Sequence, residues 1–402
     1  MIPPGRQLGV LGGGQLGTFF AVAAKRLGYR VVVWDPDPDA PARCWADRFV
    51  CAPFDDTESL RAFLLGTSGV TYEREAVPVD LVAVIEGRIP VRPGSRVLRV
   101  LQNRITQKSV LAERGLPIPA WRALGDPDAL SRVAAELGFP CVCKTATAGY
   151  DGRGQWRLSD LQLADELSRS LGSVSPASSA DARWVIEAWI PFRKELSVVV
   201  VRGAHGDLIT YPVVENAHEH GILRTSRVPA DIDAELSAKA GALAAQAIDV
   251  LGGAGVFCVE LFLLRDGTLL INEIAPRPHN SGHYTMDVCP VSQFEQQVRV
   301  LCGLPLPPPR LLSPAVMVNI LGPEIDRLQF PEASTGLFSL PGARVYHYRK
   351  RAVTAGRKMG HVLLIDPDPR QAMARAEQVR SLLGTTARRA RPAGKPRPLR
   401  TP

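Results

Sequence analysis

The most constraining feature of this sequence is residues 256–273, which read as two apolar strands joined by a tight turn. Asp266-Gly267 is a dipeptide that favours a two-residue hairpin loop. The resulting register places Glu260 directly opposite Glu273, and like charges that face each other across a ladder are destabilising. The pair therefore predicts a bound cation, and oxygen-only ligands with few protein contacts are typical of magnesium.

This register depends on the length of the turn. If the turn contains only two residues, Arg265 pairs with Thr268 and the two glutamates face each other. A slip of one residue would turn one of the carboxylates to solvent, because side chains alternate between the faces of a strand. That alternative remains open at the level of the sequence.

The net charge of +8 on 402 residues is concentrated at the C-terminus. Without the six basic residues of the Pro-rich tail Arg388–Pro402, the chain carries 42 basic and 40 acidic residues. A nearly neutral body implies no nucleic-acid surface. The tail contains no acidic residue and is predicted to be disordered; a nonspecific contact with a polyanion is the alternative.

The cysteines predict a reducing compartment. They are odd in number, and no zinc-type spacing appears among them, so we expect buried reduced thiols. No signal-peptide pattern is visible, and no apolar run reaches the roughly 18 residues that span a membrane. We therefore expect a cytoplasmic protein without a membrane partner. The seven residues are Cys44, Cys51, Cys141, Cys143, Cys258, Cys289 and Cys302.

The first domain is predicted to span residues 1–102. A strand at Gln7–Leu11 leads into the glycine cluster of residues 12–17, a helix, and a second strand at Tyr29–Trp34 that ends at Asp35. This is a βαβ opening with dinucleotide-fold spacing, which can hold any phosphate. A nicotinamide-dependent dehydrogenase is the alternative, with Asp35 on the ribose, but no hydride-transfer site follows in the sequence.

Two further units are expected after residue 102. Residues 103–305 contain Lys144, a glycine loop and the hairpin, and the Pro-rich stretch at 305–309 reads as a linker. Residues 310–385 form a small unit with strands at Ala343–Arg349 and Gly360–Ile365 and a helix near Arg370–Leu383.

Three polar clusters accompany the hairpin. The loop after Lys144 carries three glycines and can fold over a polyphosphate, although a plain surface hairpin is the alternative. Arg277 and His279 follow the second strand closely, where they could hold an anion beside the metal. Basic residues between Lys350 and His361 suggest a phosphate clamp or, alternatively, a solvated turn.

Together these stretches resemble the ATP-grasp superfamily and, within it, the 5-(carboxyamino)imidazole ribonucleotide synthases of purine biosynthesis. The resemblance runs from Gln7 to Asp366, and the pair GYDGRGQ and APRPHNSGH is its most specific part. The matching motifs are LGGGQLG (11–17), NRITQK (103–108), GYDGRGQ (149–155), ENAHEHGILRTS (215–226), INEIAPRPHNSGHYT (271–285) and GRKMGH (356–361).

The resemblance implies an α/β and α+β protein with three domains. These are a Rossmann-like pre-ATP-grasp domain at 1–102, an ATP-grasp domain at 103–305 and a small β-rich domain at 310–385, followed by the tail 388–402. The implied reaction is the ATP-dependent carboxylation of 5-aminoimidazole ribonucleotide by bicarbonate through carboxyphosphate. Magnesium is the implied ion, with manganese as the alternative, biotin is not needed, and a homodimer is expected.

The resemblance also assigns roles to residues. Glu260 and Glu273 would bind the metal. Residues implied in catalysis are Arg277, His279, Asn280 and Arg153, of which the first three would hold bicarbonate or carboxyphosphate. Residues implied in ATP binding are Arg104, Lys144, Gly149, Tyr150, Asp151, Gly152, Arg153, Gly154, Gln155, Glu187, Ala188, Trp189, Ile190, Glu195, His218, Asn272 and Glu273. Residues implied in ribonucleotide binding are Gln15, Tyr150, Asp151, Arg153, Lys350, Arg357 and Lys358.

The sequence departs from the family pattern at four positions. Ala148 replaces a glycine before the loop, Arg74 and Ala76 replace a Phe and an Asn, and Arg349 stands where a glycine usually precedes the basic patch. These changes bear on substrate affinity rather than on the reaction class. Another ATP-grasp carboxylase or ligase, and a non-catalytic nucleotide-binding regulator, are the alternatives to the synthase.

Deleting residues 388–402 should leave turnover unchanged, because the tail lies beyond the region of resemblance. Steady-state ADP release from the truncated and full-length chains tests this. A collapse of turnover on truncation would show that the tail belongs to the site.

Overall fold

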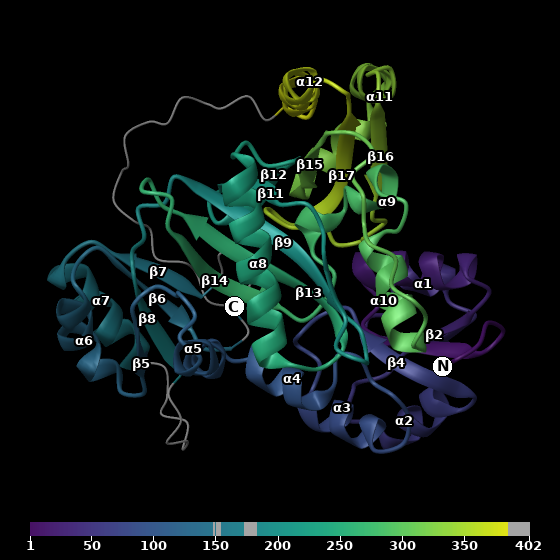
Figure 1. The fold of residues 1–402 in the computed structure, drawn as a ribbon, viewed down its shortest axis with the longest axis horizontal. Coiled ribbons are helices and arrows are strands. Elements are labelled where there is room, and N and C mark those ends of the chain that lie inside the picture. The colour runs from purple at the N-terminus through teal and green to yellow at the C-terminus, as the bar shows by residue number, and fades with distance from the viewer. Residues whose placement is uncertain (148, 150–153, 173–182, 385–402) are drawn as a thin grey trace.

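The computed structural model describes residues 1–147, 149, 154–172 and 183–384. Their strands form three sheets of four, nine and four strands. In Figure 1 the N-terminal sheet and the smaller antiparallel sheet lie on opposite sides of the large sheet, and α11 and α12 lie at its far end. The predictions for the tail and for residues 148 and 150–153 concern segments outside the described residues.

The N-terminal sheet is parallel with strand order β3-β2-β1-β4, as expected for a Rossmann-like domain. One face packs α1 and α10, while the other packs against the helices that follow β3 and β4. Every residue of β1 is buried, as in a strand covered on both faces. The elements are β1 (Gln7–Leu11), α1 (Gln15–Arg26), β2 (Arg30–Trp34), η1 (Pro41–Trp45), β3 (Arg48–Val50), α2 (Thr57–Leu64), β4 (Thr67–Tyr72), α3 (Val79–Glu86) and α4 (Ser95–Leu101).

The glycine cluster of this domain is closed by the protein's own carboxylates. The amides of Gly14 and Gly17 donate to Glu73 Oε1 and Oε2 at 2.7 and 2.8 Å. Asp35 accepts from the amide of Gly13 at 2.7 Å, and its other oxygen accepts from the amide of Asp37. The groups that would bind a dinucleotide are therefore already occupied, which removes the dehydrogenase alternative.

The small antiparallel sheet has the order β5-β8-β6-β7. Helices α6 and α7 pack on one of its faces around Cys141, Cys143 and Ile186. The elements of this part are α5 (Arg104–Glu113), β5 (Trp121–Leu124), η2 (Pro127–Ala129), α6 (Leu130–Leu137), β6 (Cys141–Thr145), β7 (Gln155–Leu158), α7 (Leu161–Gly172) and β8 (Trp184–Ala188).

The large sheet joins the central and C-terminal parts of the chain. Its order is β14-β13-β9-β11-β12-β15-β17-β16, with β10 paired to β9, and β15 pairs directly with β12. The C-terminal unit therefore extends the central sheet rather than forming a separate one. Its central elements are β9 (Lys194–Arg202), β10 (Leu208–Thr210), β11 (Val214–Glu219), β12 (Ile222–Val228), α8 (Ala234–Leu251), β13 (Gly255–Leu263), β14 (Leu269–Ala275), η3 (Asn280–Gly282), α9 (Thr285–Val288) and α10 (Gln293–Cys302).

The two strands and the helix expected in the C-terminal unit are present to within two residues, as β16 (Ala343–His347), β17 (Lys358–Ile365) and α12 (Pro369–Leu382). The structure adds β15 (Ala315–Leu321), η4 (Gly322–Gln329) and α11 (Pro331–Phe338), which were not predicted. Arg349 follows β16 with φ 58°, a conformation that favours glycine. The left-handed backbone at this position explains why the family usually has a glycine there.

The hairpin reaches the predicted pairing by another route. The predicted two-residue turn is wrong, because Leu263 pairs with Leu269 and the amide of Gly267 donates to the carbonyl of Leu264 at 3.2 Å. The ladder then shifts by one residue between Glu260 and Leu261, which leaves Asn272 as a bulge. This bulge cancels the longer turn, and Glu260 pairs with Glu273 as predicted.

The thiol prediction is only partly confirmed. All seven cysteines are free, and five are buried, but Cys44 and Cys51 are exposed. They lie in or next to irregular segments around η1 and β3, which present residues to solvent.

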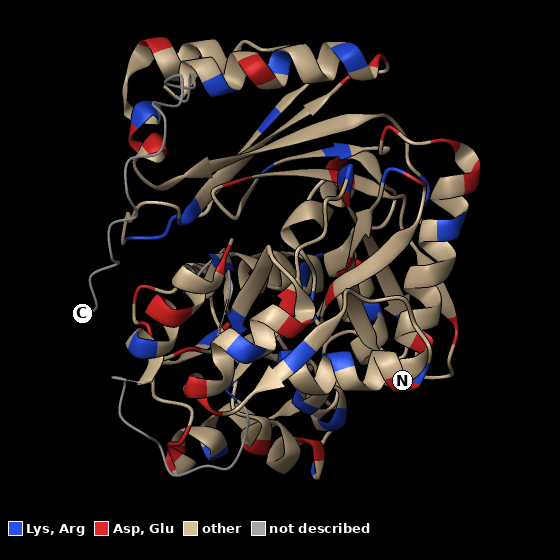
Figure 2. Ribbon diagram, turned by 90° about the vertical axis from the view of Figure 1, so that its left-hand side faces the viewer, with Lys and Arg blue, Asp and Glu red and all other residues tan. Residues whose placement is uncertain are grey.

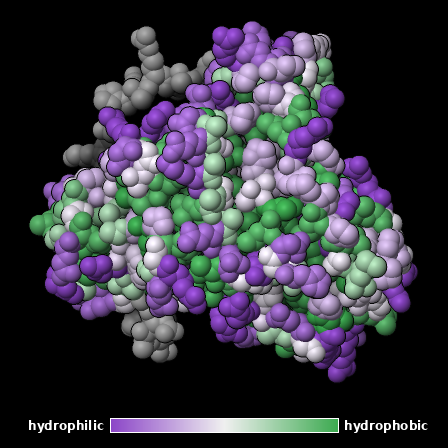
Figure 3. Space-filling model, viewed as in Figure 1, coloured by the Kyte–Doolittle hydropathy of each residue, from purple (hydrophilic) through white to green (hydrophobic). Residues whose placement is uncertain are grey.

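The surface mixes residue types. Lys and Arg are interspersed with Asp and Glu along the elements seen in Figure 2. Hydrophobic residues form small groups separated by hydrophilic ones on the face seen in Figure 3. Within the described ranges, no helix has both the length and the apolarity needed to cross a membrane.

Replacing Gly267 by Ala should lower the free energy of unfolding by about 1–2 kcal/mol, the cost of a left-handed backbone for an L-residue. Gly267 has φ 87°, and a Cβ there would meet no atom within 4 Å, so only backbone strain is added. Gly172→Ala is the control, since its Cβ is equally unobstructed and its φ is not positive. Urea unfolding of both variants tests this, and equal midpoints would contradict it.

Candidate active site

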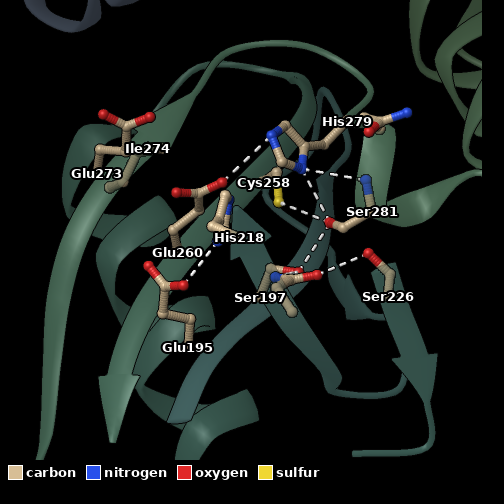
Figure 4. A network of polar contacts seen from close by, with 12 residues as sticks. Glu195, Ser197, His218, Ser226, Cys258, Glu260, Glu273, Ile274, His279 and Ser281 are labelled. Atoms are coloured by element: carbon tan, nitrogen blue, oxygen red, sulfur yellow. Dashed lines mark hydrogen bonds and ion pairs between the residues drawn. The ribbon is translucent and has the colours of Figure 1, made fainter. Parts of the chain in front are cut away.

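The site is built around two carboxylates on adjacent strands. Glu273 of β14 and Glu260 of β13 are ladder partners, and Ser197 of β9 is the next residue in the same row. Arg104, at the start of α5, forms an ion pair with Glu273. His279 Nε2 lies 3.3 Å from Glu260 Oε1 on the other side (Figure 4).

The surroundings shift the pKa values of Glu260 and Glu273 in opposite directions. Burial raises the pKa of Glu260, and the neighbouring Glu273 raises it further. Burial also acts on Glu273, but Arg104 and Lys144 outweigh it and hold the pKa of Glu273 below its usual range. Repulsion within the pair is therefore relieved by Arg104 on one side and by proton uptake on the other.

The donor set suits a hard cation that takes few protein ligands. The two opposed carboxylates supply oxygens, and the adjacent bulge residue Asn272 carries a buried Oδ1 with no hydrogen-bond partner among the described residues. No cluster of three or more His, Cys, Asp or Glu suited to a metal occurs within the described residues. A magnesium ion that completes its shell with phosphates and water fits these residues.

Two lysines share one buried carboxylate behind this pair. Lys144 Nζ donates to Glu187 Oε2 at 2.9 Å, and Lys108 Nζ lies 3.2 Å from Glu187 Oε1. The exposed fractions are 8%, 2% and 3% for Lys144, Lys108 and Glu187. Burial opposes ionisation of Glu187, but Lys144 and Lys108 lower its pKa to about 2. Burial lowers the pKa of Lys108 from its ordinary value. When both lysines are protonated, one positive charge remains in excess, which suits the binding of a polyphosphate.

Arg277 connects the hairpin end to the N-terminal domain. Its guanidinium binds both oxygens of Glu75, with Nη2 at 3.1 Å from Oε1. Burial acts against the charged form, but Glu75 outweighs it and raises the pKa of Arg277. The residue predicted to hold an anion is therefore anchored by a carboxylate of another domain.

His279 and Asn280 follow Arg277 but differ in accessibility. Burial and the nearby Arg277 keep the pKa of His279 well below its usual value, so the ring is neutral. Asn280 is buried, and its amide exchanges two hydrogen bonds with the amide of Asn319 at 3.1 and 2.6 Å. Asn280 therefore braces the loop against β15.

The residues predicted for the nucleoside lie along β8, β9 and β11. His218 Nδ1 lies 2.6 Å from Glu195 Oε2; burial lowers the pKa of His218, but Glu195 raises it more strongly. Ala188 ends β8, and the following Trp189 is partly exposed, with Arg157 lying 4.3 Å from its ring centre.

The predicted basic patch borders a cavity of about 300 Å³ between the first and last domains. Its lining includes Lys350, Arg351 and Arg357 on one side and Asp37 and Asp39 on the other. Lys350 also donates to the carbonyl of Lys358 at 2.8 Å. Gln15, the first residue of α1, is partly buried.

Three residues of the glycine loop, Gly149, Gly154 and Gln155, lie within the described part of the chain. Arg104 lies 3.4 Å from the carbonyl of Gly149, Gly154 precedes β7, and Gln155 pairs with Lys144 across the β6–β7 ladder. The four predicted residues Tyr150, Asp151, Gly152 and Arg153 lie outside the described residues.

Sequence reasoning missed two residues of the site. Lys108 ends the motif at residues 103–108, four residues after Arg104, which places both on one face of α5. Glu75 lies between Arg74 and Ala76, the two departures from the family pattern in the N-terminal domain. Neither could be paired with its partner, because Glu187 and Arg277 are distant in sequence.

The fold and site define an ATP-grasp protein. Residues 109–294 match the ATP-grasp domain, residues 6–102 the ribonucleotide synthetase preATP-grasp domain, and residues 315–375 the phosphoribosylaminoimidazole carboxylase C-terminal domain. These matches confirm the expected fold class.

Comparison with individual proteins identifies the family within the ATP-grasp class. The N5-carboxyaminoimidazole ribonucleotide synthase of Bacillus subtilis is 39% identical over 363 residues, which are 90% of this chain and 92% of the relative. A solved ADP complex of an N5-carboxyaminoimidazole ribonucleotide synthetase superimposes with a TM-score of 0.87 at 39% identity, covering 94% and 97% of the two chains. The Aspergillus clavatus synthase in complex with ADP and 5-aminoimidazole ribonucleotide has a TM-score of 0.85 at 32% identity, covering 95% and 99%. This chain belongs to the N5-carboxyaminoimidazole ribonucleotide synthase family of ATP-grasp ligases.

Replacing Lys108 by Met should raise the KM for ATP by about tenfold, or about 1.4 kcal/mol. Without Lys108, Glu187 would neutralise Lys144 alone and remove the excess positive charge. Lys25→Met is the control, since Lys25 pairs with Asp47 at the surface. Steady-state kinetics of both variants test this, and an unchanged KM for ATP in Lys108→Met would show that the excess charge does not act on ATP.

Proposed function

We propose that this chain uses ATP and bicarbonate to carboxylate the exocyclic amine of 5-aminoimidazole ribonucleotide. The products are 5-(carboxyamino)imidazole ribonucleotide, ADP and phosphate, in a step of purine biosynthesis. The observation that carries the proposal is the opposed pair Glu260 and Glu273, flanked by Arg104 and Lys144 on one side and by Arg277 and His279 on the other. The Aspergillus clavatus synthase, which has this fold, forms a complex with ADP and 5-aminoimidazole ribonucleotide.

The phosphate side of the site offsets negative charge. Lys144 and Arg104 would contact the ATP phosphates, with Gly149 to Gln155 as the loop over them. A magnesium ion held by Glu260 and Glu273, or manganese in its place, would neutralise charge on the phosphates. Asn272 lies beside these ligands, and its buried Oδ1 has no partner in the part of the chain that the structure describes.

The bicarbonate side activates a poor electrophile. Transfer of the terminal phosphate of ATP to a bicarbonate oxygen forms carboxyphosphate and releases ADP. The amine of the ribonucleotide then attacks the carboxyl carbon and loses a proton while phosphate leaves. We assign the anion to Arg277 and His279, which would hold it in place, and Asn280 would act by bracing their loop. Because carboxyphosphate is labile in water, exclusion of solvent is part of the chemistry.

The two nucleotides would occupy different ends of the site. The adenine pocket would be lined, partly through backbone atoms, by Glu187, Ala188, Trp189 and Ile190. Glu195 would bind the ribose, and His218 would be a further nucleotide contact. We assign the ribonucleotide phosphate to the cavity lined by Lys350 and Arg357. Lys358 and Gln15 are assigned to the same substrate from the family resemblance. Tyr150, Asp151 and Arg153, which lie outside the described residues, are assigned to the same ribonucleotide from the family resemblance.

We also propose a cellular compartment and an oligomeric state for the enzyme. We place it in the cytoplasm because its thiols are free. We propose a homodimer, which light scattering can test. Biotin has no role in this chemistry, since the amine itself accepts the carboxyl group.

The discriminating experiment measures ADP release with each substrate omitted in turn. Release that requires both bicarbonate and 5-aminoimidazole ribonucleotide is expected. Stimulation by an amino acid or by biotin would point to another ATP-grasp ligase, and ATP binding without ADP release would point to a regulator.

Replacing Glu273 by Gln should reduce kcat by at least about 10³-fold, because Arg104 loses its partner and the metal loses a ligand; this corresponds to about 4 kcal/mol. Glu235→Gln, on the exposed face of α8, is the control. Crystals with an ATP analogue and manganese should show an anomalous peak between Glu260 and Glu273 in the unsubstituted protein. Ordered triphosphate without such a peak would disprove the metal assignment.

A further inference from the structure

A chain of buried hydrogen bonds runs through the large sheet beneath His279 (Figure 4). Ser226 of β12 donates to Asn216 Oδ1 at 2.8 Å, and Asn216 Nδ2 donates to Ser197 Oγ at 2.9 Å. Ser197 Oγ lies 2.8 Å from Ser281 Oγ, which lies 2.8 Å from His279 Nδ1. The four residues beneath the histidine are between 1% and 7% exposed.

The direction of this chain can be deduced from the donors. The backbone amide of Ser281 also points to His279 Nδ1, at 3.4 Å, and an amide can only donate. Nδ1 is therefore an acceptor, so the Ser281 hydroxyl donates to it. Ser197 then donates to Ser281 and accepts from Asn216, which agrees with the orientation of the Asn216 amide.

We infer that the chain Ser226–Asn216–Ser197–Ser281 holds His279 as the neutral tautomer with its proton on Nε2, so that His279 acts as a hydrogen-bond donor to the bicarbonate-derived anion. This inference rests on the proposed function for the identity of the anion. A ring whose Nδ1 lone pair is occupied by donors and whose Nε2 already bears a proton cannot accept the proton of the substrate amine. His279 is thus a donor in the reaction, and the four residues beneath it are positioning residues.

The position of the donor fits this role. Nε2 lies 3.3 Å from Glu260 Oε1, so the proton points toward the carboxylate pair. A neutral donor fixed before the substrate arrives can stabilise charge that develops on an oxygen without reorganisation.

The tautomer can be measured without any substrate. In protein labelled with nitrogen-15 in its histidines, multiple-bond nitrogen–proton correlation spectra distinguish the two neutral tautomers, and the spectrum of His279→Gln assigns the signal among the seven histidines. The expected result is the Nε2–H form. An Nδ1–H ring would overturn the inference.

Asn216→Asp tests the chain itself, because a carboxylate accepts from both Ser226 and Ser197. Ser197 would then accept from Ser281, and His279 should shift toward the Nδ1–H form. Ser281→Ala provides a second variant should the Asn216→Asp substitution prevent folding, and it should lower kcat by about tenfold or less, with the KM for ATP unchanged. Cys258→Ala is the matched control for packing, since its sulfur is equally buried and its hydrogen bond to Ser281 Oγ is long, at 3.9 Å, and lies outside the four-residue chain. A loss in Cys258→Ala equal to that in Ser281→Ala would show a packing effect and overturn the assignment.

The role of His279 follows from two substitutions. His279→Ala should lose on the order of 10²–10³-fold in kcat, as expected for one oxyanion donor. His279→Gln keeps an N–H donor but no base, so it should recover at least about tenfold of that loss. Equal activity of the two variants would indicate a base and overturn the donor role. Failure of the proposed function would look different, because the unsubstituted chain would then release no ADP in response to 5-aminoimidazole ribonucleotide, whatever the tautomer.

Discussion

The opposition of Glu260 and Glu273 across buried strands is the interaction on which the site depends. Two carboxylates in this position cannot both remain ionised without compensation. Arg104 pairs with Glu273, and His279 approaches Glu260. In addition, burial and the neighbouring Glu273 raise the pKa of Glu260, which favours its protonation. The repulsion between the two carboxylates favours the binding of a divalent cation, whereas phosphate would be attracted by that cation and by Arg104 and Lys144.

The other charged residues around the site are also paired, and their partners come from distant parts of the chain. Arg277, which follows the hairpin, forms an ion pair with Glu75 of the N-terminal domain. Lys108 and Lys144 each form an ion pair with one oxygen of Glu187. Each pair joins segments that are far apart in sequence. Buried ion pairs of this kind stabilise little against apolar packing, but losing one partner is costly, so they fix the geometry of the site.

The two glycine clusters show how similar motifs acquire different functions. The first is closed by Glu73 and Asp35, which take the place of a ligand phosphate on the backbone amides. The second follows Lys144, where an excess positive charge remains available. A glycine pattern predicts a backbone that can approach an anion; which anion occupies it is decided by side chains from other strands.

The sequence by itself determined the strand and helix order, the family resemblance and the facing of Glu260 and Glu273, because hydrophobic alternation and local motifs encode them. It failed on the turn at Asp266-Gly267, where a longer loop and a bulge at Asn272 cancel each other. It also missed Lys108 and Glu75, and it could not show that Asn280 is bonded to Asn319 or that β15 extends the central sheet. These features depend on contacts between distant segments, and the free energy of such contacts is set by burial and three-dimensional neighbours rather than by spacing along the chain.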